Sequence, residues 1–219
     1  MGSGTKIKID GLRDAGSALV AAESGADFTG FAFVEGVRRQ LQPAEGKAII
    51  AEYRKLAHDR GVTMPKVVGL FRDQEVGWVN DLAVSAGLEM AQLCGEEDEA
   101  YFSKLRIPLI KVVRAKPGDS VAKINATVEP MLAKGHLVAL DRYDEKVPGG
   151  AGIPWDWSAM RTVAQRNGVF IAGGLTPSNV GQLVSDIAPW GVDVSSGVET
   201  DGIKDPAKIR AFIAAVRSA

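Results

Sequence analysis

Two aspartates end apolar runs of strand length and could act as a general acid and a general base. Asp10 ends the run 6–10, and Asp141 ends the run 137–141. Side chains alternate between the two faces of a strand, so Lys8 and Asp10 share one face and the isoleucines beside them share the other. If both runs are strands of one barrel, the two carboxylates meet at its rim and can divide the two roles. Each aspartate alone could equally be a turn residue or a loop cap.

Glycine-rich and serine-rich turns follow two later strand candidates and could hold a phosphate. The first turn contains Gly173 and Gly174, and the second contains Ser195, Ser196 and Gly197. Backbone N–H groups that no Cβ shields, together with a helix N-terminus, bind phosphate. Barrels often place their phosphate site after strands seven and eight. Such turns are also ordinary in α/β proteins, and it is their joint position that favours a phosphate.

The remaining polar features are less specific. Arg38 and Arg39 follow the second strand candidate and could grip a carboxylate in bidentate fashion, although a solvated surface pair explains them equally well. The glycine-rich segment 149–152 could be a mobile lid or a flexible loop. A single cysteine, Cys94, excludes an internal disulfide, and the two histidines lie far apart, so no metal site is expected.

Strand-like apolar runs alternate with helical patterns along the chain. The eight strand candidates are 6–10, 28–33, 66–71, 89–93, 109–114, 137–141, 169–172 and 192–195. A helical candidate follows each, and Asp205-Pro206 and Thr176-Pro177 both have the pattern of an N-cap followed by proline at the first helical position. Eight such units predict a (β/α)₈ TIM barrel that forms one domain over residues 1–219. An open doubly wound sheet remains the alternative, because spacing does not fix strand order.

Composition narrows the class of protein. Apolar residues make up 46% of the 219 residues, and Lys and Arg total 26 against 27 for Asp and Glu. This balance is typical of a globular protein and argues against binding to nucleic acid or to an anionic membrane surface. No apolar run has the length of a membrane span, and no signal peptide is apparent, so a cytoplasmic location is expected.

The chain resembles the phosphoribosylanthranilate isomerases of tryptophan biosynthesis nearly from end to end. The most specific segments are Ala-Gly-Gly-Leu-Thr-Pro at 172–177 and Val-Asp-Val-Ser-Ser-Gly-Val-Glu at 192–199. Further matches are Glu-Ser-Gly-Ala-Asp at 23–27, Gly-Phe-Ala-Phe at 30–33 and Ala-Gln-Leu at 91–93. The resemblance implies a (β/α)₈ barrel that performs an Amadori rearrangement of a small phosphoribosyl substrate. It implies no metal or organic cofactor, and either a monomer or a homodimer.

The resemblance also assigns roles to residues. It implies that Asp141 is the general acid and that Arg39 lies near the anthranilate carboxylate. It implies that Gly173, Gly174 and the turn 195–197 hold the phosphate. Asp193 is expected to contact the sugar, and Lys8 is expected among the substrate-binding residues.

The chain departs from the family pattern where the general base should lie. Residues 8–11 are Lys-Ile-Asp-Gly, where the family has Lys-Ile-Cys-Gly, so Asp10 stands in place of the catalytic cysteine. An ordinary aspartate is already ionised at neutral pH, and a related histidine-pathway isomerase uses an aspartate base for the same rearrangement. Cys94 replaces a usual histidine, and residues 153–155 differ in the lid. Two alternatives therefore remain: an isomerase of another phosphoribosyl amine or sugar phosphate, and a non-catalytic phosphosugar-binding protein.

Overall fold

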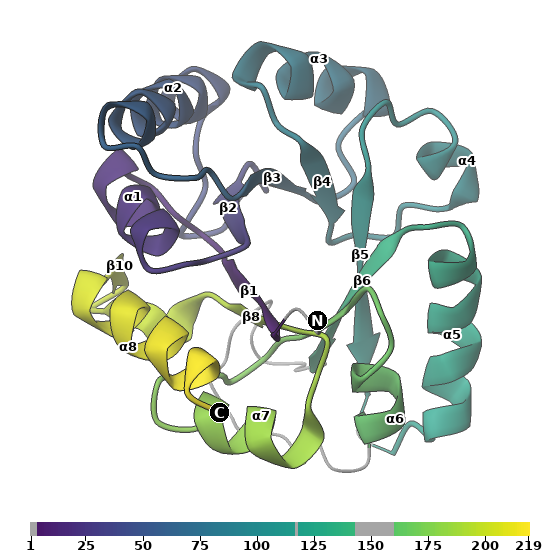
Figure 1. The fold of residues 1–219 in the computed structure, drawn as a ribbon. Coiled ribbons are helices and arrows are strands. Elements are labelled where there is room, and N and C mark those ends of the chain that lie inside the picture. The colour runs from purple at the N-terminus through teal and green to yellow at the C-terminus, as the bar shows by residue number, and fades with distance from the viewer. Residues whose placement is uncertain (1–3, 117, 143–159) are drawn as a thin grey trace.

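Eight parallel strands close into a barrel in the computed structural model, which describes residues 4–116, 118–142 and 160–219 (Figure 1). The strands are β1 Lys6–Ile9, β2 Phe28–Ala32, β3 Lys66–Phe71, β4 Met90–Leu93, β5 Leu109–Ala115, β6 Leu137–Arg142, β7 Val169–Ile171 and β8 Gly191–Val194. Each strand pairs with the next in sequence, and β8 pairs with β1 to close the ring. The predicted (β/α)₈ barrel is confirmed, and the open-sheet alternative is wrong.

Helices surround the barrel on its outside (Figure 1). They are α1 Ala15–Glu23, α2 Pro43–Asp59, α3 Val76–Ala86, α4 Glu99–Phe102, α5 Val121–Ala133, α6 Arg161–Ala164, α7 Val180–Ile187 and α8 Pro206–Arg217. A short 3₁₀ turn, Ser196–Val198, and the two-stranded ribbon β9 Glu199–Thr200 and β10 Ile203–Lys204 lie between β8 and α8. No helix in the described part of the chain is long and apolar enough to cross a membrane.

One of the two predicted helix starts is confirmed and the other is wrong. The Asp205 carboxylate accepts hydrogen bonds from two backbone N–H groups of α8, and proline follows it. After β7, however, α7 begins only at Val180. The Asn179 side chain accepts from the Thr176 N–H at 2.8 Å and donates to the Gly174 carbonyl at 2.9 Å. These bonds close a separate turn over the glycine pair, which delays the helix by one turn.

Alternation along the strands separates the helix-facing core from the barrel interior. Ile7 and Ile9 are fully buried in the core between the strands and the outer helices, whereas Lys8 between them points inward. A separate apolar cluster fills the middle of the barrel and comprises Phe28, Val68, Met90, Ile110, Ala139 and Phe170. The Phe28 and Phe170 rings meet edge to face with centroids 5.2 Å apart. These apolar side chains fill the barrel interior. Polar groups that could react are therefore limited to its open end.

Candidate active site

A cavity opens at the carboxyl ends of the strands, where barrel enzymes carry out their chemistry. Its lining includes nine of the residues singled out from the sequence, namely Asp10, Arg39, Asp141, Gly173, Gly174, Asp193, Ser195, Ser196 and Gly197. These residues come from both halves of the chain. Lys8 is different, because it is fully buried below the cavity and does not line it. The expectation that Lys8 touches substrate is therefore corrected: its ammonium group contacts aspartates instead.

Lys8 joins two buried carboxylates at the floor of the cavity. Its Nζ forms an ion pair with Asp10 Oδ2 and a second with Asp193 Oδ2 at 3.1 Å. The β1–β8 register, which places Lys8 beside Asp193, explains this contact. Burial raises the pKa of Asp193 to about 8, and the charge of Asp10 acts in the same direction. Burial and the Asp10 charge therefore favour the protonated form of Asp193, while the Lys8 ammonium lies against both carboxyl groups.

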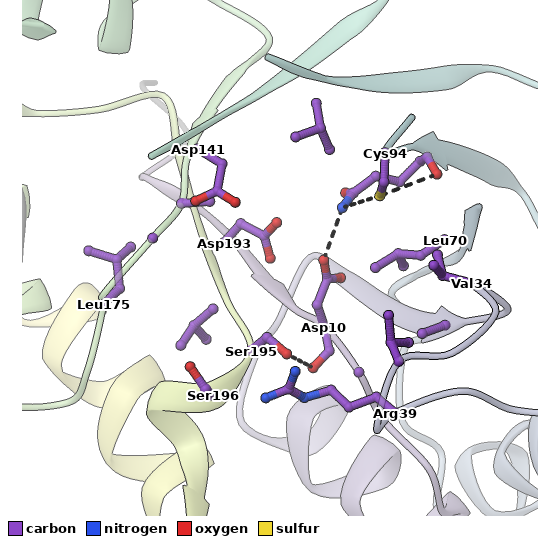
Figure 2. A pocket seen from close by; sticks show the side chains of 18 of the residues that line it. Asp10, Val34, Arg39, Leu70, Cys94, Asp141, Leu175, Asp193, Ser195 and Ser196 are labelled. Atoms are coloured by element: carbon purple, nitrogen blue, oxygen red, sulfur yellow. Dashed lines mark hydrogen bonds between the residues drawn. The ribbon is translucent and has the colours of Figure 1, made fainter. Parts of the chain in front are cut away.

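Asp10 is held in place by its neighbours but keeps one oxygen unpaired. Gln92 Nε2 donates to Asp10 Oδ2 at 3.3 Å, and the Ser195 hydroxyl donates to the Asp10 carbonyl at 3.3 Å (Figure 2). Asp10 Oδ1 is buried and has no hydrogen-bond partner among the described residues. A buried acceptor that has no donor lowers the stability of the folded protein. That the protein keeps this oxygen in such a state indicates a functional role. With no donor to it among the described residues, this oxygen is able to accept a proton.

Asp141 lies on β6 and faces the same cavity. Figure 2 shows its carboxyl group on the far side of Asp193 from Asp10. Asp141 is half-buried, whereas Asp10 is almost fully buried. The two carboxyl groups therefore flank one space in different surroundings, which is the arrangement that lets one act as an acid and the other as a base.

The turns after β7 and β8 pack against each other at one edge of the cavity. Gly173 and Gly174 have φ values of 90° and 70°, which few other residues adopt. A Cβ on Gly197 would lie 2.9 Å from the Leu175 carbonyl carbon, so only glycine permits this approach. Lys204 Nζ donates to the Ser195 carbonyl at 2.7 Å and fixes the second turn. The two predicted phosphate turns thus form one continuous backbone surface.

Arg39 reaches the cavity but is also bound by a carboxylate that the sequence did not reveal. Its Nε and Nη2 donate to the two oxygens of Glu199 at 2.6 and 2.9 Å. Lys204 Nζ contacts the same carboxylate at 2.8 Å. Burial opposes ionisation of Glu199, but Arg39 and Lys204 lower its pKa to about 2. The Glu199 carboxylate is therefore ionised at neutral pH. It orients Arg39 and neutralises part of the positive charge of that side chain.

Comparison with known proteins agrees with this geometry. The family model described as N-(5'phosphoribosyl)anthranilate (PRA) isomerase matches residues 7–215. The chain belongs to this family. The isomerase of Roseiflexus castenholzii is 40% identical over 97% of this chain and 98% of its own. That of Dehalococcoides mccartyi is 38% identical over 98% and 96% of the two chains.

Solved phosphoribosylanthranilate isomerases share the architecture as well. A crystal structure of the enzyme from Thermotoga maritima superposes with a TM-score of 0.82 at 29% identity, covering 98% of this chain and 100% of the other. A second solved isomerase, in complex with reduced 1-(o-carboxyphenylamino)-1-deoxyribulose 5-phosphate, gives a TM-score of 0.79 at 28% identity, with the same coverage. Another structure from Thermotoga maritima concerns a dimeric isomerase converted to monomers.

Other residues of this family member complete the cavity and were not singled out as site residues. Four of them are polar or sulfur-containing. They are Arg72 directly after β3, Gln92 within β4, Cys94 directly after β4 and Arg114 within β5. Strand alternation would have placed them inward, because Gln92 follows Met90 by two positions and Arg114 follows Ile110 by four. No group of metal-ligating side chains occurs among the described residues. The lid segments 149–152 and 153–155 lie outside the residues that the structure describes.

Proposed function

We propose that the protein is a phosphoribosylanthranilate isomerase that uses Asp10 as general base and Asp141 as general acid. The observation that carries this proposal is the family match over residues 7–215, combined with two carboxyl groups that flank one cavity beside paired glycine turns. The reaction converts N-(5-phosphoribosyl)anthranilate into its 1-deoxyribulose 5-phosphate isomer. The proposed chemistry needs only proton transfer and uses neither a metal nor an organic cofactor.

The rearrangement divides into two proton transfers. Asp141 donates its proton to the furanose ring oxygen, the bond from that oxygen to C1 breaks, and the nitrogen lone pair forms a Schiff base. Asp10 then removes the proton from C2, and the electron pair of that C–H bond moves toward nitrogen to give an enolamine. Tautomerisation of the enolamine yields the ketone product. Asp141 thus gives up one proton and Asp10 takes one, as general acid–base catalysis requires.

The surroundings of Asp10 support its assignment as base. Lys8 behind it and Gln92 beside it fix the carboxylate, and neither contacts Oδ1. Lys8 is fully buried, so water does not screen its charge. A carboxylate that is oriented in advance reaches the C2 proton without reorganising, which partly offsets its weaker basicity compared with a thiolate.

The two anionic groups of the substrate are assigned to two features of the cavity. The 5-phosphate fits the backbone surface of Gly173, Gly174 and the turn 195–197, where N–H groups favour an anion. Arg39, held by Glu199, is assigned to the anthranilate carboxylate. Asp193, whose raised pKa favours its protonated form, can donate a hydrogen bond to a sugar hydroxyl. Whether one or two copies of the chain form the active enzyme stays a prediction.

Turnover of freshly prepared N-(5-phosphoribosyl)anthranilate, followed by anthranilate fluorescence, tests the proposal. Purified protein should consume the substrate and form the 1-deoxyribulose product. The Asp10→Cys variant is the matched comparison, because it restores the residue usual in the family. Absence of turnover by the unmodified protein, together with turnover by Asp10→Cys, would show that Asp10 is not a working base. Turnover of a different phosphoribosyl amine alone would favour the second isomerase hypothesis.

A further inference from the structure

Two arginines line the active-site cavity and have no carboxylate partner among the described residues. Arg72 follows β3 directly, and Arg114 lies near the end of β5. Both are half-buried and both contribute to the cavity wall. Within residues 4–116, 118–142 and 160–219, no ion pair joins either guanidinium to an acidic side chain. This distinguishes them from Arg39, Lys8, Lys111 and Lys204, each of which has a carboxylate partner.

Both residues lie next to Cys94 in the barrel wall. Arg114 Nη2 donates to the Cys94 carbonyl at 2.8 Å, which leaves its other N–H groups for a ligand. The β3–β4 register pairs Leu70 with Gln92, so Arg72 and Cys94, two residues further along each strand, lie side by side. Burial raises the pKa of the Cys94 thiol to about 11, so the thiol beside them is uncharged at neutral pH. A partly desolvated guanidinium group costs free energy when no anion balances its charge. We therefore expect a ligand to supply that anion.

The arginines lie across the barrel mouth from the phosphate turns. In the closed ring, β4 is the strand opposite β8, and β3 and β5 are its neighbours. The turn Ser196–Val198 follows β8, and the Gly173-Gly174 turn follows β7. A ligand that spans the mouth therefore meets backbone N–H groups at one end and two guanidinium groups at the other. Asp10 and Asp141 line the wall of the same cavity.

We propose that Arg72 and Arg114 form a second anion subsite, which binds an oxyanion on the amine half of a phosphoribosyl substrate. This proposal rests on the proposed function only for the position of the 5-phosphate at the β7 and β8 turns. The shared chemistry is a carboxylate or phosphate gripped by planar guanidinium groups. Two sources fit: the anthranilate carboxylate, which would then bind here instead of at Arg39, or a second phosphate on a larger amine. The second source would extend the activity to doubly phosphorylated phosphoribosyl amines.

Calorimetric binding at fixed ionic strength separates these sources. One probe pair is fructose 6-phosphate and fructose 1,6-bisphosphate, which differ in a second phosphate. The other pair is reduced 1-(o-carboxyphenylamino)-1-deoxyribulose 5-phosphate and its analogue without the carboxylate. The variants are Arg72→Gln and Arg114→Gln, with Arg114→Lys to retain the charge. Arg210→Gln is the matched control, because Arg210 is exposed on α8, away from the cavity.

We expect the protein to bind the doubly anionic member of at least one pair about tenfold more tightly than its partner, as charged hydrogen bonds allow. Arg72→Gln and Arg114→Gln should remove most of that preference, Arg114→Lys should retain part of it, and Arg210→Gln should leave it unchanged. Loss within the bisphosphate pair alone identifies a second phosphate, and loss within the carboxylate pair identifies anthranilate. Equal preferences in wild type and both glutamine variants would overturn the subsite. None of these readouts requires turnover, so failure of the proposed isomerase activity is seen separately.

Discussion

A methyl group added at Gly30 should displace the proposed base without unfolding the barrel. Gly30 lies in β2 and faces the Asp10 side chain. A Cβ on Gly30 would overlap Asp10 Oδ1, and would lie 2.9 Å from Asp10 Cγ and 3.0 Å from Leu70 Cδ1. Carbon atoms in contact are ordinarily about 3.5–4.0 Å apart, so the carboxyl carbon must retreat by about 0.6–1 Å. The atoms in the way belong to side chains, so the backbone can stay where it is.

The cost of this displacement follows from the demands of proton transfer. Misplacing a reacting group by about 1 Å can lower the rate about 100-fold, so Gly30→Ala should reduce kcat by about that factor. Stability should change little, because alanine is better tolerated than glycine in a strand by about 0.5–1 kcal/mol, and this gain offsets part of the strain. Steady-state kinetics on N-(5-phosphoribosyl)anthranilate and a thermal melt of the same sample measure the two effects.

Gly181→Ala is the matched control. Its Cβ would meet the Ala215 carbonyl oxygen at 3.4 Å, an ordinary contact, and Gly181 lies within α7 outside the cavity. This variant should keep full kcat and gain up to about 1 kcal/mol of stability, because alanine favours helix. A Gly30→Ala enzyme with kcat within twofold of wild type would refute the argument that the position of Asp10 limits the reaction.

Three further predictions concern the charged and polar groups around the site. Gln92→Leu removes the donor to Asp10 and should lower kcat about tenfold at nearly constant KM, the loss expected for one hydrogen bond to a charge. Glu199→Gln leaves Lys204 buried without a carboxylate, and urea denaturation should show a loss of about 3 kcal/mol. The raised pKa of Asp193, about 8 against 3.8 unfolded, means that the folded state binds the extra proton between these values. Stability should therefore fall from pH 4 to pH 8, by at most about 1.4 kcal/mol per pH unit, and Asp193→Asn should flatten this slope. An equal slope in both proteins would contradict that assignment.

Local patterns predicted the fold and much of the site because strand geometry is regular. Alternation in β1 correctly placed Ile7 and Ile9 against the helices and Lys8 inside the barrel. Each strand was predicted to within one residue at either end. The glycine turns after β7 and β8 were identified because glycine alone suits their backbone, and they lie together as expected.

The features that were missed depend on contacts between residues distant in sequence. Glu199 binds Arg39 across 160 positions, and no local pattern indicates that pairing. The inward direction of Arg72 and Arg114 follows from strand alternation, but that neither pairs with a carboxylate in the described part of the chain appears only when the neighbouring strands are in place. The early helix start predicted at Thr176 was wrong because the Asn179 side chain closes a turn there first.

The most direct test of the account is kcat on N-(5-phosphoribosyl)anthranilate for Asp10→Asn and Asp141→Asn beside the unmodified protein. Asparagine keeps the size of each side chain and removes its capacity to exchange a proton. General acid or base catalysis contributes about 100- to 10,000-fold, so each variant should lose at least about 100-fold in kcat while its thermal melt stays cooperative. Wild-type kcat in either variant would contradict the division of roles between Asp10 and Asp141.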